Sequence, residues 1–386
     1  MWSRPALAAA ALLAASAGLP QEPSFQVTAG NELDLARAGE TIEVPLASLP
    51  GLKADDLARL SVVETRSGRE LLAQATDGDG DHDFDRLVFQ ADLGPRETKA
   101  FALTLGTRHL PRPEEFRVYG RFVRERFDDF AWENDRVAHR TYGEALETWR
   151  KEPLTSSAID VWVKRTRRLV VNDWYMADDY HADHGEGADL YSAGPSRGCG
   201  GSGIWDGQAL SVSRNFRGSR VLANGPLRLI FELTYLPWAA GAQTVAERKR
   251  VTLDAGSNLN RFESTYDVQG GGAVTWAAGI KKAPGAEVRV EKQAGWVRTW
   301  EPFKDPNAGH LGCAIVVDPA ALVDVVESGN NILVLGRSPA GKPATYLAGS
   351  AWDRGPDFTG VADWDRYLQE AARRLGAPLK IDVRAG

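Results

Sequence analysis

Long apolar runs, cysteine and excess positive charge are all scarce in this chain of 386 residues. The apolar run Pro5–Leu13 is far shorter than the roughly 20 residues of a membrane-spanning helix, and no later stretch approaches that length. We therefore expect no membrane span. The formal net charge is −6, whereas non-specific nucleic-acid binding needs a basic face, so nucleic acid is not an expected partner. The phosphate-loop Gly-Lys-Ser/Thr is also missing.

The first residues predict export. Arg4 supplies a positive charge before the apolar run, and Ala15-Ser16-Ala17 offers small residues for cleavage, so residues 1–17 are predicted to be a signal peptide. The mature protein is then expected to be secreted or periplasmic. In such a compartment Cys199 and Cys313 could form a disulfide or stay as two buried thiols, and their spacing in sequence does not decide between these.

Turn-forming residues are frequent, with 39 glycines and 20 prolines but no low-complexity tract. Short alternating runs between residues 22 and 110 predict a small β-sandwich domain. Longer runs within residues 114–386 predict an all-β catalytic domain, a large antiparallel β-supersandwich of the galactose mutarotase and polysaccharide lyase type. Two helices are predicted as well, over residues 135–151 and 363–376; the second carries an apolar stripe and ends at a glycine.

Three stretches concentrate polar side chains, and the first is the aspartate-rich segment 77–85. Its five aspartates stand at alternate positions, as in calcium-binding loops, but the glutamate that closes an EF-hand is absent. The segment is therefore either a calcium site or a solvated hairpin turn.

The second stretch, residues 124–143, alternates charged and aromatic side chains. Guanidinium groups bind carboxylates or sulfates in pairs of hydrogen bonds, and an aromatic face can stack on a sugar ring. If Asn134 caps the predicted helix, His139 and Tyr142 lie one turn apart on one face. The alternative is a structural network of ion pairs. The candidate substrate-binding residues are Arg124, Arg126, Arg136, Asn134 and Trp132, and the candidate catalytic residues are Glu133, His139 and Tyr142.

The third stretch, residues 178–194, contains two histidines, five carboxylates, two tyrosines and three glycines. His181, His184 and Glu186 are ligand types that zinc accepts, so a divalent metal (Zn or Ca) is possible, although the spacing is not that of a zincin helix. The same groups could instead transfer protons directly, with a carboxylate orienting a histidine. The candidate catalytic residues here are His181, Glu186 and Tyr191; Asp189 and, from a neighbouring strand, Trp162 are candidates for substrate binding.

These motifs resemble a family of secreted bacterial proteins defined as a domain of unknown function, whose members commonly sit among genes for degradation of pectin and other uronate polysaccharides. The resemblance rests on the stretches "RFDDFAWENDRVAHRTYG", "IDVWVKR", "YHADHGEGADLYSAGPSRGCGG", "NGPLRLIFELTY" and "LDAGSNLNRFES". It covers most of the mature chain. It implies a β-supersandwich and a role on plant or algal carbohydrate, without an established mechanism.

The residues and the resemblance together predict an enzyme acting on uronic-acid-containing oligosaccharides by β-elimination. In that reaction an arginine or a metal neutralises the uronate carboxylate, a histidine or tyrosine removes the C5 proton, and a tyrosine or histidine protonates the leaving oxygen. Hydrolysis by Glu133 and Glu186, or an epimerase-like proton exchange at a sugar anomeric carbon, is the alternative for an enzyme. A carbohydrate-binding protein without turnover is the alternative of another class.

Overall fold

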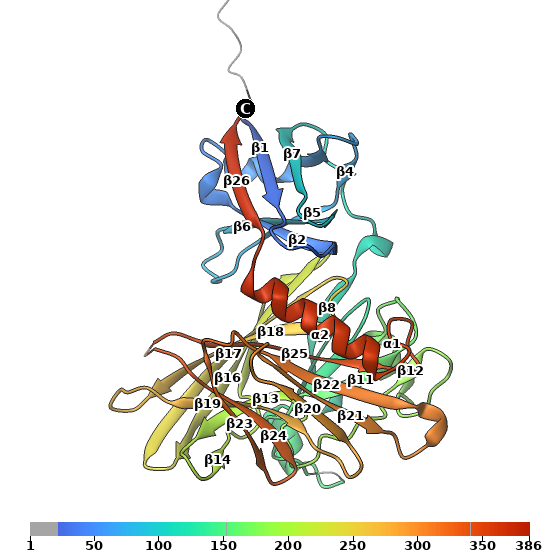
Figure 1. Cartoon of the computed structure of the whole chain (residues 1–386), viewed down its shortest axis with the longest axis vertical. Helices are drawn as coiled ribbons and strands as arrows, with labels where there is room; N and C mark the ends of the chain where they lie inside the picture. Colours follow the sequence, from blue (N-terminus) through green and yellow to red (C-terminus); the bar gives the residue numbers. More distant parts are fainter. Residues whose placement is uncertain (1–21, 152, 340) are drawn as a thin grey trace, which may run out of the picture.

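The computed structural model describes residues 22–151, 153–339 and 341–386, so the predicted signal peptide lies outside the described residues. Figure 1 shows a smaller body of strands above a larger one, with a long helix lying across the larger body near their junction. Every strand pair within the sheets is antiparallel. The predicted all-β fold class is confirmed.

The smaller body packs two sheets against each other. The five-stranded sheet has the order β26-β1-β7-β3-β4, formed by Lys380–Ala385, Ser24–Gly30, Thr98–Leu105, Leu60–Glu64 and Glu70–Leu71. The three-stranded sheet has the order β2-β6-β5, formed by Arg37–Pro45, Arg86–Leu93 and Ala73–Thr76. Alternate side chains of both sheets fill the core between them, where the rings of Phe89 and Phe101 meet edge to face at 4.9 Å.

The last strand, β26, extends this sheet from the far end of the chain by pairing with β1. The predicted domain 114–386 included residues 380–385, whereas in the structure these residues belong to the smaller body. The sequence of a single six-residue strand does not reveal its partner. Ile381 and Val383 pack on the core of the small sandwich, while Asp382 and Arg384 are exposed. Both termini of the described chain are therefore held in one sheet.

We expect the double substitution Ile381→Ser/Val383→Ser to lower the free energy of unfolding by about 2–3 kcal/mol, since it removes two partly buried apolar side chains from this core. The matched control, Asp382→Ser/Arg384→Ser, changes the exposed face of the same strand and should have little effect. Urea denaturation followed by circular dichroism measures both. Equal losses in the two variants would contradict the assignment of the faces.

The larger body contains three sheets. The eight-stranded sheet has the order β15-β16-β17-β18-β25-β22-β21-β20, formed by Gly218–Asn224, Arg228–Ala240, Gln243–Asp254, Leu259–Val268, Ala344–Trp352, His310–Val316, Trp296–Pro302 and Glu287–Glu291. A five-stranded sheet has the order β14-β13-β19-β24-β23, formed by Leu210–Ser211, Cys199–Trp205, Thr275–Lys281, Asn331–Arg337 and Leu322–Ser328. The other has the order β12-β11-β10-β9-β8, formed by Gly187–Ala188, Asp160–Lys164, Ala138–Thr141, Asp129–Asn134 and Val118–Val123.

Two α-helices accompany the sheets in the described part of the chain. The helix α2 (Val361–Gly376) confirms the predicted C-terminal helix and buries Trp364, Leu368 and Ala371 against β21 and β22 (Figure 1). The short helix α1 (Val171–Ala177) lies in the connection between β11 and β12. Among the described residues no helix is long and apolar enough to cross a membrane.

The helix predicted over residues 135–151 is wrong: the chain forms β10 and then a 3-10 turn, Glu144–Thr148. Asn134 caps a tight turn instead of a helix, because its Oδ1 accepts hydrogen bonds from the amides of Arg136 and Val137 at 2.8 and 2.9 Å. Every residue of β10 is buried. A strand sends alternate side chains to opposite faces, so His139 and Arg140 enter two different environments, which a one-sided helix cannot provide.

Candidate functional site

One face of the sheet containing β8–β12 carries a buried group of charged and phenolic side chains. Arg140 on β10 stands opposite Asp160 on β11, and its Nε donates to Asp160 Oδ2 at 2.9 Å. Arg140 Nη2 lies 2.9 Å from Asp189 Oδ2, and Nη1 lies 3.6 Å from Asp129 Oδ2. Two phenols complete what we call the Arg140 cluster: Tyr142 donates to Asp160 at 2.8 Å and Tyr175 donates to Asp129 at 3.4 Å.

The charges of the Arg140 cluster do not balance on their own, because three carboxylates surround one guanidinium. Burial raises the pKa of Asp129 to about 7, although Arg140 partly opposes that shift. Burial also raises the pKa of Asp189 well above its usual range, again against the attraction of Arg140. For Arg140, burial alone would lower the pKa, but Asp189 and Asp160 raise it, so the guanidinium stays charged. The cluster can therefore hold an acidic proton near neutral pH.

The segment between β11 and β12 covers this cluster. Trp162 of β11 is stacked between Trp174 and Tyr180, with ring centroids 5.5 and 5.2 Å away. Trp162 is 1 % exposed, and the predicted substrate contact for this residue would require the covering segment to move. Tyr180 is also buried, and burial raises its pKa, which keeps the hydroxyl protonated.

His181 lies where the Arg140 cluster reaches the surface. Its side chain is 62 % exposed, whereas that of Asp189 beside it is fully buried. His181 Nδ1 lies 3.2 Å from the carbonyl oxygen of Asp189 and 3.5 Å from Asp189 Oδ2, and the His181 ring packs on Tyr180 at 4.5 Å. Arg126 acts on the same groups, because its charge lowers the pKa of both Asp189 and Tyr180. The predicted residues His181 and Asp189 thus lie in contact, and Arg126 is near enough for its charge to act on Asp189.

The predicted metal ligands do not gather. His181 faces Asp189, His184 Nε2 lies 2.9 Å from Asp179 Oδ2, and Glu186 Oε2 lies 2.6 Å from Arg168 Nη2 on the surface. The Arg168 guanidinium lowers the pKa of Glu186. These three side chains point to separate partners, so they do not fit a zinc site. Glu186 is likewise not directed at the Arg140 cluster.

Within the described ranges, the aspartate-rich turn is the one place where three potential ligand side chains come close enough to share a metal ion. Ligand oxygens of Asp77, Asp79 and Asp85 lie within 4.8 Å of one another. However, Asp77 already accepts the amides of Gly80 and His82, and Asp79 accepts that of Asp81. The contacts are those of a well-formed turn, and calcium remains a prediction.

Four predicted residues on β9 and β10 are enclosed and support the fold. Glu133 Oε2 accepts from Lys164 Nζ at 2.7 Å, and Glu133 Oε1 accepts from the amides of Val170 and Val171 at 2.7 Å each. The Trp132 indole donates to Asn260 in the core. Burial lowers the pKa of His139 to about 4, so this imidazole is neutral. The four residues are Trp132, Glu133, Asn134 and His139. All four are buried, so none of them is positioned to bind a sugar.

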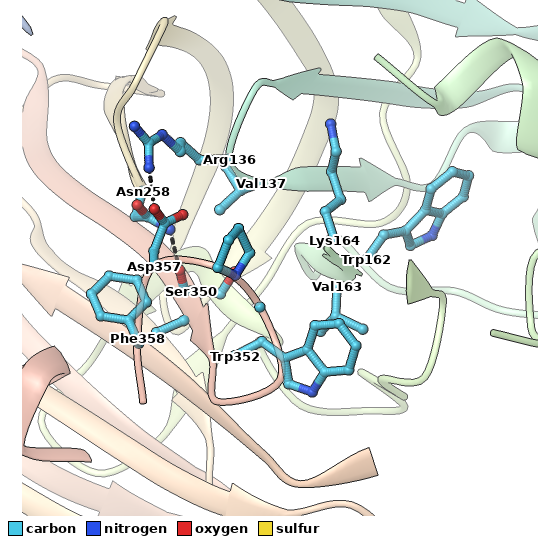
Figure 2. A pocket seen from close by; sticks show the side chains of 13 residues that line it. Arg136, Val137, Trp162, Val163, Lys164, Asn258, Ser350, Trp352, Asp357 and Phe358 are labelled. Atoms are coloured by element: carbon cyan, nitrogen blue, oxygen red, sulfur yellow. Dashed lines mark hydrogen bonds and ion pairs between the residues drawn. The ribbon is translucent and has the colours of Figure 1, made fainter. Parts of the chain in front are cut away.

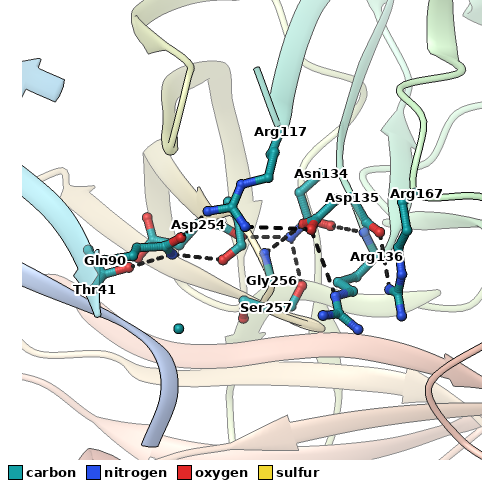
Figure 3. A network of polar contacts seen from close by, with 12 residues as sticks. Thr41, Gln90, Arg117, Asn134, Asp135, Arg136, Arg167, Asp254, Gly256 and Ser257 are labelled. Atoms are coloured by element: carbon teal, nitrogen blue, oxygen red, sulfur yellow. Dashed lines mark hydrogen bonds and ion pairs between the residues drawn. The ribbon is translucent and has the colours of Figure 1, made fainter. Parts of the chain in front are cut away.

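Arg136 belongs to a different surface. It forms an ion pair with Asp357, which also binds Arg167, at the rim of a small hollow lined by Trp162, Lys164 and Trp352 (Figure 2). Figure 3 shows the wider network around it, in which Asn134 donates to the carbonyls of Asp254 and Ser257 at 2.6 and 2.7 Å. Arg124, another predicted arginine, is exposed in the 3-10 turn Arg124–Arg126. Of the three predicted arginines, Arg126 is the one whose charge lowers the pKa of Asp189.

Tyr191 lies in the hydrophobic core of the larger body. It is buried, its hydroxyl has no hydrogen-bond partner, and Lys281 Nζ stands 4.6 Å above its ring. Burial raises the pKa of Tyr191 well above its usual range. Tyr191 therefore keeps its proton, but nothing described connects its hydroxyl to His181.

Several residues of the site escaped the sequence analysis. Arg140, Asp160, Tyr175 and Tyr180 stood within or beside the quoted motifs, yet a helical prediction for 135–151 separated Arg140 from its partners. The segment Gly194–Gly198 also reads Gly-x-Ser-x-Gly, the pattern of a serine-hydrolase elbow. Ser196 is fully buried and donates to the Ala193 carbonyl at 2.6 Å, and it precedes a strand rather than a helix. It is not an exposed nucleophile.

The pKa values of two buried groups predict how stability depends on pH. Asp129, with its pKa raised from 3.8 to about 7, binds its proton more tightly in the folded state, so its contribution to stability falls as pH rises through that window. His139, with its pKa lowered from 6.5 to about 4, contributes stability that falls as pH drops through its window. Between about pH 4.5 and pH 6.5 the two trends oppose each other.

Asp129→Asn removes only the first of these trends. We therefore expect the unfolding free energy of this variant to rise more steeply between about pH 4.5 and pH 6.5 than that of the wild type, by roughly 1–2 kcal/mol over the window. Urea denaturation at several pH values measures the slope. Parallel curves for the two proteins would show that Asp129 is ionised throughout.

The sequence and the fold were compared with known proteins. An "Uncharacterized protein P7" from Formosa agariphila is 32 % identical over 392 residues, covering 97 % of this chain and 98 % of that protein. Solved structures similar to this chain include an alpha-mannosidase from Enterococcus faecalis V583 and a protein in the glycosyl hydrolase family 38 from Enterococcus faecalis. Both have 11 % identity and a TM-score of 0.49, covering 94 % and 95 % of this chain.

The chain spans about half the length of those two solved proteins, 46 % and 48 % respectively. A family model matches nearly the whole described chain, over residues 30–381. The chain belongs to the family described as "Domain of unknown function (DUF4861)".

Proposed function

We propose that this protein is an exported enzyme that cleaves uronic-acid-containing oligosaccharides by β-elimination, with His181 as the base. The observation that carries the proposal is the pair formed by an exposed imidazole and a buried carboxylate. Asp189 faces His181 Nδ1, so a proton on Nδ1 is held there and Nε2 is left as an acceptor toward solvent. An acceptor that orients the imidazole in this way is what a histidine base requires.

The acidity of the substrate proton is the second requirement. A uronate C5 proton becomes removable when a cation neutralises the carboxylate next to it. Arg126 is half-buried, its guanidinium lies 4.9 Å from the ring of Trp149, and its charge acts on Asp189 and Tyr180. It is the arginine that we assign to the substrate carboxylate.

The third requirement is a proton for the leaving oxygen. Tyr180 touches the His181 ring and keeps its proton, because burial raises its pKa. Asp129, with a pKa of about 7, is the second group of the site that holds a proton near neutral pH. Tyr180 is the donor we favour, since it lies next to His181 whereas Asp129 lies below the covering segment.

Hydrolysis is the second candidate, and one observation favours it. A glycosidase needs one carboxylic acid that keeps its proton and one carboxylate. Asp129 and Asp189 lie around the same guanidinium; burial raises both pKa values while the charge of Arg140 lowers them, so one carboxyl of the pair can keep its proton and the other can be ionised. This pair replaces Glu133 and Glu186 as the hydrolytic hypothesis, because Glu133 is enclosed by Lys164 and by the start of α1.

Incubation with a panel of pectic and algal uronate oligosaccharides tests the proposal. β-Elimination leaves a 4,5-unsaturated uronate, so far-ultraviolet absorbance should rise as new chain ends form. New reducing ends without absorbance would favour hydrolysis. Saturable binding without new ends would identify a carbohydrate-binding protein and would contradict both enzymatic candidates.

A further inference from the structure

The two cysteines lie on opposite sheets of the larger body and meet in its core. Cys199 begins β13 and Cys313 lies within β22, and Cα atoms of these two strands approach to within 8 Å. The Cys199 thiol donates to the carbonyl of Gly349 at 3.1 Å. Gly349 and Ser350 of β25 pair with Ala314 and Cys313 of β22. The Cys199 sulfur is therefore held directly beside Cys313.

Both thiols are buried and are free in the structure. Burial, and next the neighbouring Cys199 thiol, raise the pKa of Cys313 well above its usual range. A thiol of this kind is a poor nucleophile while the fold is closed. Tyr191 belongs to the same hydrophobic core as both cysteines.

We propose that Cys199 and Cys313 are an oxidation site and form a disulfide that joins β13 to β22 across the sandwich. A small-molecule disulfide such as oxidised glutathione is the oxidant. One cysteine thiolate attacks it and releases one glutathione thiol, giving a mixed disulfide; the other cysteine thiolate then displaces the second glutathione. Both cysteine protons leave with the released thiols, the two cysteines are oxidised, and one glutathione disulfide is reduced.

The adjacency of the sulfurs, and not the sequence spacing, supports this step. Disulfide formation needs sulfurs in contact and Cα atoms a few ångströms apart, which facing strands of two packed sheets can provide. The bridge would close a loop of more than a hundred residues between positions 199 and 313, so it would strongly restrict the unfolded chain. It would also restrain the core around Tyr191 without contacting His181. The inference is independent of the proposed reaction.

The test uses the full chain, purified with a thiol reductant and then held in buffer containing oxidised glutathione. To remove the barrier of burial, one sample is unfolded in denaturant and refolded in the same buffer. Alkylation under denaturing conditions, followed by mass spectrometry, counts free thiols. We expect both thiols to be lost, the mass to fall by two hydrogen atoms, and the melting temperature to rise by about 5 °C over the reduced protein.

The single variants Cys199→Ser and Cys313→Ser are matched controls, because each keeps one thiol and its surroundings. Neither should show the rise in melting temperature on oxidation. A refolded wild-type protein that keeps two free thiols would overturn the proposal. Glutathione attached to either cysteine of the refolded wild type, in place of the internal bridge, would overturn it too.

Discussion

Arg140→Met is expected to lower the free energy of unfolding by about 3–5 kcal/mol, because a buried charge network loses its central cation. Asp129, Asp160 and Asp189 all lie within 3.6 Å of the Arg140 guanidinium and are buried with it. Methionine has a similar length but no charge, so three carboxyl groups would have to bind protons or remain unpaired. Urea denaturation followed by tryptophan fluorescence measures the loss.

The matched control for this substitution is Arg165→Met. Arg165 also pairs with an aspartate and lies over Trp352, but its side chain is 35 % exposed, and exposed ion pairs contribute less than about 1 kcal/mol. Adding Asp189→Asn to Arg140→Met should recover part of the lost stability, since one of the three negative charges disappears. If Arg140→Met costs no more than Arg165→Met, the cluster is not the electrostatic centre that the geometry indicates.

His181→Gln is expected to lower kcat/KM on an acidic oligosaccharide by about 10²- to 10⁴-fold, the usual contribution of a positioned base. The melting temperature should stay close to that of the wild type, because the His181 side chain is largely exposed. Steady-state kinetics and thermal denaturation of the same preparation separate the two effects. Loss of activity together with loss of fold would not fit a base at the surface.

His184→Gln is the control for this variant. His184 lies three residues away in the same segment and is also exposed, but its partner is the exposed Asp179 and not a buried carboxylate. It should retain nearly the wild-type kcat/KM. Equal losses for the two variants would indicate that the segment as a whole, and not the pairing of His181 with Asp189, matters for activity.

Sequence patterns predicted the fold class because a period of two is visible wherever a strand has one buried face. The C-terminal helix was equally visible, since Trp364, Leu368 and Ala371 recur at helical spacing. The strand β10 was misread because both of its faces are buried, so polar and apolar residues follow each other without a simple period. The pairing of β26 with β1 is a contact between the two ends of the chain, and local patterns carry no information on it.

Part of the site was predictable from composition. His181, Asp189 and Arg126 were singled out because histidine is rare in the chain and because arginine suits carboxylates. Whether a charged residue reaches solvent could not be predicted in the same way. Glu133 and Glu186 have the same chemistry, but one caps the start of α1 in the interior and the other pairs with Arg168 at the surface. The register of β9, β10 and β11 brings Arg140 together with Asp129 and Asp160, and the segment after β12 adds Asp189.

The most direct measurement compares one uronate polysaccharide with the same polymer after its carboxylates have been reduced to alcohols, each incubated with the wild-type protein. In the proposed reaction Arg126 binds the carboxylate and His181 removes the neighbouring proton. We therefore expect a rise in far-ultraviolet absorbance with the acidic polymer and no cleavage of the reduced one. Equal release of new chain ends from both polymers would contradict elimination at a uronate.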